Sequence, residues 1–338
     1  MFPCKRQRRQ TSMKRKRRRN IGWLKDLAAI LIFLLLFPYF ALSFKQQKEE
    51  FMGKESDSGE KQILEMYEQL SELPHNGNYY VLGEDNGVSL KLPIEHYLVG
   101  ALAASISVEY EEEVLKAQTV ILRSSLMEEY ENSEKMQDGT REILPDERGG
   151  RYWTDAEMQS RWGKQYEQNL EKCLNAVMQT QGIYLTYKGE SIKGYYHGMS
   201  AGGTRNANEL SEGERCSYLK QTSCPENLSA ADYLTELQIS KKEAGELTDA
   251  QVNAEGYVLS ACKDGVRISG EKLREELGIM SSNFTWDEEG DDYVFLIKGQ
   301  GHGFGLDQYY GNMLAQKGMS YPEIIDYFFD DVVYQRME

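Results

Sequence analysis

The feature that most constrains this chain is an uncharged apolar run over residues 27–44, LAAILIFLLLFPYFALSF. With the apolar residues 21–23 in front of it, the run approaches the roughly twenty residues that a helix needs to cross a bilayer core. Pro38 would kink such a helix, which membrane spans tolerate. Ten of the first nineteen residues are Lys or Arg, and such a cluster keeps its side of a span in the cytoplasm. The sequence therefore predicts a transmembrane anchor over residues 21–44.

A cleaved signal peptide is the alternative interpretation of this segment, because Ala41 and Ser43 are small residues of the kind found near cleavage sites. The apolar run and the basic region are both long for a signal peptide, so an uncleaved anchor is favoured. We expect a single-pass protein of the cell membrane with a basic cytoplasmic tail over residues 1–20. The remaining chain then lies outside the cytoplasm, and the basic tail is also suited to anionic lipid.

The charge reverses after the apolar run. Of the 39 Lys and Arg and 54 Asp and Glu residues, 28 and 53 respectively follow Phe44, so that part has a net charge near −25. This excess argues against nucleic acid as a partner. Residues 45–78 are polar, and the spacing of Ile63, Met66 and Leu70 predicts a stalk that is helical in its second half.

Residues 79–338 are expected to form one domain that mixes helices and antiparallel hairpins. Helical spacing begins at residues 94, 111 and 154, and hairpins are predicted around the turns at 84–87 and 188–189. Residues 212–290 are expected to be irregular, with short helical patches near Ala230 and Leu273. A strand at residues 293–297 and two terminal helices follow. The mixture predicts an α+β fold.

The chain has five cysteines, of which Cys4 is expected to be cytoplasmic and the other four to lie outside. An even number outside permits disulfides, and Cys216 with Cys224 is the pair closest in sequence. Four cysteines in a domain of this size do not form a disulfide scaffold, and no C-x-x-C motif is present. The pairing of Cys216 with Cys224 therefore stays open.

Four segments resemble, in order and spacing, the SpoIID/LytB (stage II sporulation protein D) family. They are LPIEHYLVG at 92–100, LKAQTVILR at 115–123, YYHGMSAGGT at 195–204 and GHGFGLDQYYG at 301–311. Together they extend over nearly the whole part of the chain outside the membrane. The resemblance implies a grooved domain that holds a peptidoglycan glycan strand. It also implies either lytic cleavage of that strand or stimulation of a wall hydrolase.

The sequence departs from the family at the position of the catalytic acid. In catalytic members the first helix ends in Ala-Ala-Glu, whereas this chain reads Ala103, Ala104, Ser105. Lytic cleavage needs an acid that protonates the glycosidic oxygen, which a serine hydroxyl cannot do near neutral pH. The resemblance therefore predicts a retained groove in a protein that binds glycan or activates a hydrolase. The alternative interpretation is a structural module without glycan affinity, which would have the same fold and location.

Two other carboxylates are candidates for the acid of an active lytic transglycosylase, Glu109 and Asp307. Each has a structural alternative, because Glu109 precedes a helix start rich in glutamate and Asp307 stands where a helix cap is expected. Some family members carry a Cys/His zinc cluster, but residues 144–153, LPDERGGRYW, contain neither residue type. We therefore expect no metal and no cofactor.

The residues expected to contact glycan lie in or beside two glycine-bearing loops, where functional residues tend to gather. The aromatic residues Tyr195, Tyr196 and Phe304 are able to stack on sugars, although core packing would explain them equally well. The glycines from 299 to 305 lack the Gly-Lys-Ser/Thr ending of a phosphate-binding loop. The predicted contact residues are His197, Ser200, Gly202, Gly203, Thr204, His302, Gly303, Gln308 and Tyr309.

Overall fold

The computed structural model describes residue 59 and residues 61–73, 77–85, 88–136, 138–144 and 151–337. The basic tail, the predicted anchor, Cys4 and the first part of the stalk lie outside the described residues. Within those described ranges, no helix is both long and apolar enough to cross a bilayer. All elements below belong to one compact unit that begins at Lys61.

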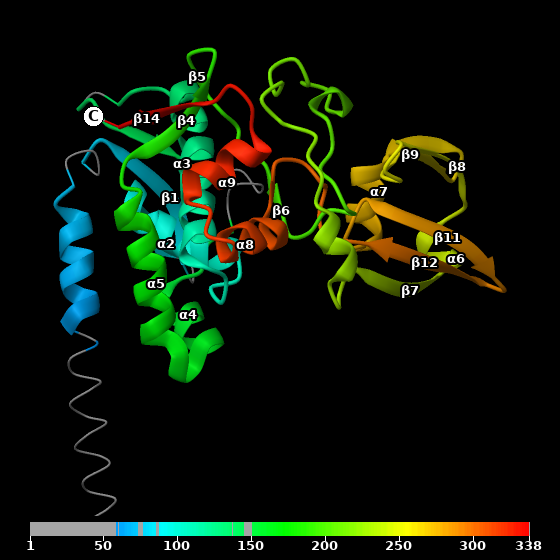
Figure 1. Cartoon of the computed structure of the whole chain (residues 1–338), viewed down its shortest axis with the longest axis horizontal. Helices are drawn as coiled ribbons and strands as arrows, with labels where there is room; N and C mark the ends of the chain where they lie inside the picture. The colour runs from blue at the N-terminus through cyan, green and yellow to red at the C-terminus, as the bar shows by residue number, and fades with distance from the viewer. Residues whose placement is uncertain are drawn as a thin grey trace, which may run out of the picture. The chain divides into compact units, whose positions relative to one another are not determined.

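The larger part of this unit is built around the long helix α3 (Glu112–Asn132). It contacts α2 (Ile94–Ser105) and α5 (Tyr166–Gln179), and on its other sides α8 (Gln308–Gln316) and α9 (Tyr321–Phe328) (Figure 1). α4 (Asp155–Trp162) precedes α5 and starts at the predicted capping box. Apolar residues spaced by threes and fours face inward on these helices, which produces one shared core.

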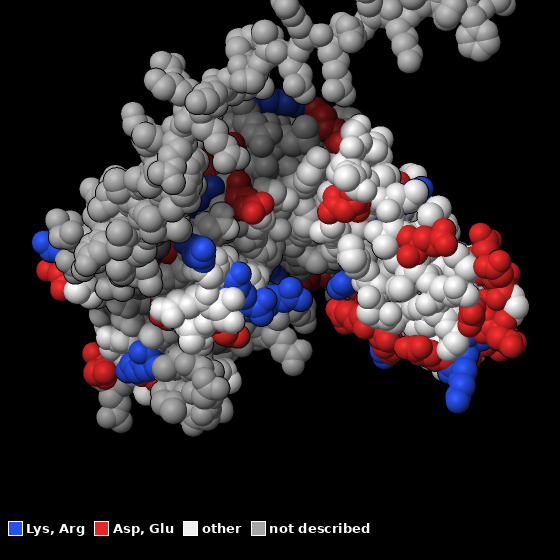
Figure 2. All heavy atoms as spheres, turned by 90° about the horizontal axis from the view of Figure 1, so that it is seen from below, with Lys and Arg blue, Asp and Glu red and all other residues white. Residues whose placement is uncertain are grey.

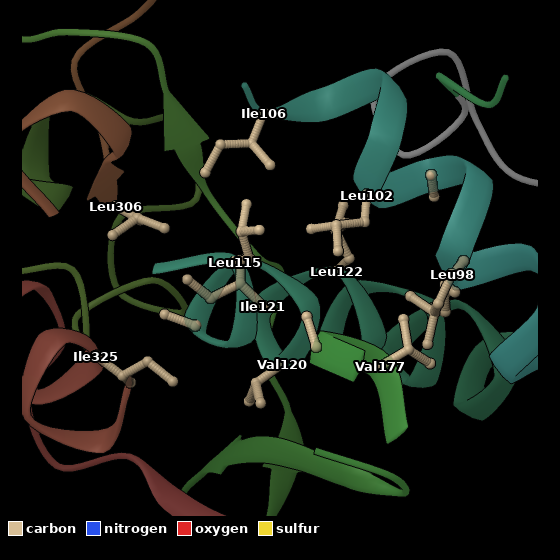
Figure 3. Close-up of a cluster of buried hydrophobic side chains, with 14 of the residues drawn as sticks. Leu98, Leu102, Ile106, Leu115, Val120, Ile121, Leu122, Val177, Leu306 and Ile325 are labelled. Atoms are coloured by element: carbon tan, nitrogen blue, oxygen red, sulfur yellow. The ribbon is translucent and has the colours of Figure 1, made fainter. Parts of the chain in front are cut away.

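Figure 3 shows this core in close-up, with side chains from several elements pointing toward one another. Leu98 and Leu102 of α2 lie one turn apart, and both are fully buried. Side chains of α3 and of the C-terminal segments complete the cluster. Burial of each such side chain contributes roughly 1.5–3 kcal/mol. The labelled residues are Leu98, Leu102, Ile106, Leu115, Val120, Ile121, Leu122, Val177, Leu306 and Ile325.

Short sheets lie at the edges of the helical layer. β1 (Tyr79–Asp85) pairs antiparallel with β2 (Val88–Pro93) and parallel with β3 (Arg141–Ile143). β4 (Ile183–Tyr187) pairs antiparallel with β5 (Glu190–Ser191) and with β14 (Val333–Arg336). Positive φ at Lys188 and Gly189 is what a two-residue type I′ turn requires. Both predicted hairpins and the α+β class are confirmed.

A second group of strands forms what we call the β lobe, residues 234–298 (gold and orange in Figure 1). Its first sheet joins β7 (Leu234–Ser240), β12 (Asp292–Lys298) and β11 (Asn283–Glu289), all antiparallel. Its second joins β8 (Leu247–Val252), β9 (Val258–Lys263) and β10 (Val266–Ser269). Two helices, α6 (Lys241–Ala244) and α7 (Gly270–Leu277), complete it.

The β lobe corrects the expectation of irregular chain over residues 212–290. The lobe has its own apolar cluster, in which Leu273, Phe284 and Phe295 are at most 1% exposed. The lobe is acidic, with 14 Asp and Glu against 7 Lys and Arg in residues 234–298. Figure 2 shows these acidic side chains gathered over the lobe. Acidic residues at the exposed positions of these strands obscure the alternation of apolar and polar residues that marks a strand. The predicted helical patch near Leu273 is confirmed as α7.

The second half of the predicted stalk is helical over residues 61–71 and packs on the larger core. Leu70 is fully buried. The Tyr67 ring lies edge-on to His96 of α2, and Gln62 donates a 2.6 Å hydrogen bond to Glu171 of α5. This segment is therefore part of the folded unit.

Candidate functional site

The two glycine-bearing loops, residues 198–204 and 299–305, lie side by side. β6 (Tyr196–His197) precedes the first loop and pairs in parallel with β13 (Leu306–Asp307), which follows the second. Met199 and Gln300 exchange backbone hydrogen bonds of 3.0 and 2.7 Å between the loops. Gly301 has a φ of +101°, and a Cβ there would lie 2.7 Å from that of His197. The close approach of the loops therefore requires glycine at this position.

Asp307 lies at the centre of a buried polar cluster and is itself fully buried. One carboxylate oxygen accepts hydrogen bonds from the Ser200 amide (2.8 Å) and the Asn227 side chain (2.6 Å). The other oxygen accepts from the Tyr310 amide at 2.9 Å, so Asp307 is the N-cap of α8. The carboxylate thus ties the 198–204 loop to the last helices.

His197 lies beside this carboxylate and is itself buried. Its Nδ1 lies 3.0 Å from the Phe304 carbonyl oxygen, which only accepts, so Nδ1 carries a hydrogen. Its Nε2 lies 3.7 Å from Asp307 Oδ2, too far for a hydrogen bond but close enough for a protonated ring to attract the carboxylate. Burial alone would raise the pKa of Asp307, but His197 and the surrounding donors outweigh it and hold that pKa below its usual value. The carboxylate therefore stays ionised, the opposite of what a general acid needs.

Asp307→Asn should destabilise the protein at neutral pH by about 2–3 kcal/mol, because hydrogen bonds to a charged group are lost. The pKa of Asp307 is lower in the folded protein than in the unfolded chain, where it is about 3.9. The ionised carboxylate therefore stabilises the fold at pH values above about 3.9, and this stabilisation is lost as the pH falls through the pKa of the folded protein. Urea unfolding at pH 7 and at acidic pH should show the difference between wild type and variant shrinking in acid. A difference that does not depend on pH would contradict an ionised Asp307.

His302 is partly exposed at the tip of the second loop. Its Nδ1 accepts a 3.0 Å hydrogen bond from the Phe304 amide, so the neutral ring carries its hydrogen on Nε2. Partial burial of the ring, followed by the positive charges of His197, Arg274 and Arg205, lowers the pKa of His302 well below its usual value. His302 is therefore a neutral hydrogen-bond donor at physiological pH.

Two residues outside the motifs hold the loops in place. Arg205, which is 3% exposed, donates hydrogen bonds to the His302 carbonyl oxygen (3.1 Å) and to Glu271 of the β lobe (2.7 Å). Tyr257 of the β lobe accepts a 2.9 Å hydrogen bond from the Ala201 amide, and its ring blocks any side chain at Gly303. The β lobe therefore supports both loops.

Ser105, the last residue of α2, lies next to the start of α8. Its hydroxyl is partly exposed and donates to the Leu102 carbonyl oxygen at 3.2 Å. The Gln308 amide donates to the Ser105 carbonyl oxygen (2.8 Å) and to Gln118 of α3 (3.1 Å). The structure thus brings the end of α2 beside the residue that follows Asp307.

The remaining predicted residues differ in exposure. Ser200 and Thr204 are fully buried, and Thr204 bonds to the backbone of residues 220 and 222, so both shape the loop. Gly202 and Gly203 are partly exposed in the same loop, and Tyr309 is partly exposed on α8. Glu109 is exposed in the turn between α2 and α3, separate from the buried cluster.

The sequence analysis did not select Asn227, Arg205, Tyr257 or Asp232, although all four contact the two loops. They stand outside the motifs, and no spacing in the sequence marks them. The cysteines Cys173, Cys216, Cys224 and Cys262 are free thiols. Within the described ranges, no group of three metal-ligating side chains is placed to hold an ion.

Comparisons with known proteins identify relatives of this chain. Residues 84–187 match the sequence model of the family described as SpoIID, stage II sporulation protein. The chain is 31% identical to stage II sporulation protein D of Bacillus amyloliquefaciens over 254 residues, which cover 71% of this chain and 74% of that protein. It is 28% identical to stage II sporulation protein D of Bacillus subtilis (strain 168) over 251 residues, 70% and 73% of the two chains.

Proposed function

This chain belongs to the stage II sporulation protein D family, and on that premise we propose that it binds peptidoglycan glycan strands without cleaving them itself. The observation that supports the proposal is a serine, Ser105, at the end of α2, where the resemblance led us to expect the family's catalytic glutamate, in contact with Gln308 at the start of α8. Binding requires the loops and their donors, which are present. Cleavage requires an acid, and Ser105 cannot supply one.

The environments of the two candidate acids support a binding role. Asp307 is ionised, fully buried and occupied by three donors. Glu109 is exposed to water, where nothing shields it from solvent. A catalytic carboxylic acid instead needs surroundings that keep it protonated near neutral pH. An active lytic transglycosylase using Glu109 or Asp307 is therefore the weaker alternative.

The donors that remain are suited to a neutral polyol. His302 offers an Nε2 hydrogen at the tip of the 299–305 loop, and Tyr309 offers a partly exposed ring and hydroxyl. The basic tail and the apolar run lead us to expect this surface outside the cytoplasm, tethered through residues 21–44. In that location a glycan-binding protein without an acid would act by presenting the strand to a separate wall hydrolase, or by activating that hydrolase.

The test is co-sedimentation of the full-length protein with purified, peptide-free glycan strands, followed by mass spectrometry of the soluble fraction. We expect saturable binding, weakened by His302→Ala, and no anhydro-muramyl products. Products that disappear on Asp307→Asn or Glu109→Gln would establish the transglycosylase alternative. If the wild-type protein does not bind strands and His302→Ala changes nothing, the result would instead favour a structural module without glycan affinity.

A further inference from the structure

One exposed carboxylate outside every motif is attached to the 299–305 loop. Asp232 lies in the turn that leads into β7, and its Oδ2 accepts a 2.8 Å hydrogen bond from the Gln300 side chain. Gln300 is itself fixed, because its backbone pairs in both directions with Met199. The loop therefore holds Asp232 in one orientation while leaving its carboxylate in contact with solvent.

A continuous series of contacts leads from Asp232 to Ser105. The Gln300 side chain lies against Gly198, where a Cβ would be 3.0 Å from its amide oxygen. The Gly198 carbonyl oxygen accepts a 3.0 Å hydrogen bond from the Tyr309 amide. Gln308, the residue before Tyr309, donates to the Ser105 carbonyl oxygen. Asp232 is thus connected to Ser105 through Gln300, Gly198 and the start of α8.

Two tyrosines lie beside this series of contacts. Tyr110 follows α2 and is partly exposed, as is Tyr309. Burial, and then the negative charges of Asp232, Asp307 and Tyr309, raise the pKa of Tyr110 to about 12. Its phenol is therefore protonated at physiological pH and able to donate a hydrogen bond. Its position near both carboxylates agrees with the contacts above.

These groups together select for one kind of ligand. A carboxylate accepts hydrogen bonds from hydroxyl and amide donors, the phenols and the Gln300 amide both donate and accept, and the rings offer flat apolar faces. Asp232 would repel a carboxylate or a phosphate. Of the two sugars that alternate in peptidoglycan, N-acetylglucosamine is uncharged, whereas N-acetylmuramic acid carries an acidic lactyl group or the peptide attached to it.

We propose that Asp232, oriented by Gln300 and flanked by Tyr110 and Tyr309, binds the hydroxyl and amide groups of an N-acetylglucosamine residue. The inference rests on the proposed glycan-binding function and assigns which sugar occupies this part of the surface. Asp232 is a binding residue here, and Ser105 remains the reason that the strand is not cleaved.

The experiment measures binding of the N-acetylglucosamine tetramer to the full-length protein by isothermal titration calorimetry. Asp232→Asn should weaken binding by roughly 10- to 100-fold, because the strong hydrogen bonds to a charged acceptor are lost. Tyr309→Ala should also weaken it. Asp287→Asn removes the same charge from an exposed position of β11 and should leave the affinity unchanged. Circular dichroism checks that each variant is folded.

The outcomes separate this inference from the function on which it rests. Unchanged affinity of Asp232→Asn, or wild type that binds glycan strands but not the tetramer, overturns the inference and leaves strand binding standing. Wild type that binds neither ligand overturns both. Anhydro-muramyl products that vanish in Asp232→Asn would overturn the assignment as a binding residue, since Asp232 would then be the acid.

Discussion

Ser105→Glu should give the protein glycan-cleaving activity, or raise any background cleavage by about 10²- to 10⁴-fold, the usual contribution of a general acid. The substitution introduces a carboxyl group at the end of α2, where the side chain is partly exposed beside the start of α8. Asp307 stays buried beneath this surface and does not compete for the same space. The measurement is the rate at which anhydro-muramyl products appear from purified glycan strands.

Ser105→Gln is the matched control, because it has nearly the shape of the glutamate variant but no acidic proton. It should bind strands and release no products. Ser105→Glu that binds strands but cleaves no faster than Ser105→Gln would contradict the expectation. The surroundings that raise the pKa of a catalytic glutamate would then be absent at this position.

The helical part of the fold could be predicted from the sequence because its signals are local. Thr154 and Glu157 form the predicted capping box, with the Glu157 amide bonded to the Thr154 hydroxyl and the Thr154 amide bonded to the Glu157 carboxylate. The core positions of α2 and α3 follow from apolar spacing along each helix. Such patterns depend on residues three or four positions apart, and one sequence displays them directly.

The β lobe could not be predicted in the same way. β12 pairs with β7, so that Phe295 lies opposite Leu237, more than fifty residues away. The exposed positions of β11 are largely acidic and give the strand a polar appearance. Strand pairing between distant segments is decided by shared burial, and no local pattern encodes it. The two three-stranded sheets were therefore missed.

The residues of the candidate site likewise fall into those that the sequence identifies and those that it does not. His197, Ser200, His302 and Asp307 stand in motifs, and the structure brings them together through β6 and β13. Asn227, Arg205 and Asp232 reach the same loops from segments with no distinguishing spacing. The sequence also could not show which residues of the site are buried and which are exposed. Asp307 was a candidate acid until its burial and its three donors were known.

A second large effect is expected at Glu95 and Arg123, which form a fully buried ion pair between α2 and α3. The guanidinium donates two hydrogen bonds, of 2.9 and 2.6 Å, to the two carboxylate oxygens, and a third to the Ile183 carbonyl oxygen. Glu95→Gln or Arg123→Met should each destabilise the protein by about 3–5 kcal/mol, because an unpaired charge is left in the core. Chemical unfolding of each variant measures the loss.

The double variant Glu95→Leu with Arg123→Met should lose less stability than either single variant, since no charge then remains buried. Glu288→Gln is the matched surface control, because Glu288 pairs with Lys241 in solvent and such pairs contribute at most about 1 kcal/mol. If the single variants at Glu95 and Arg123 lose as little stability as this control, the expectation of a buried, charged contact between the helices is wrong.

The pair also holds α2, and therefore Ser105, against α3 and the start of β4. A destabilised pair should for this reason weaken glycan binding before the protein unfolds globally.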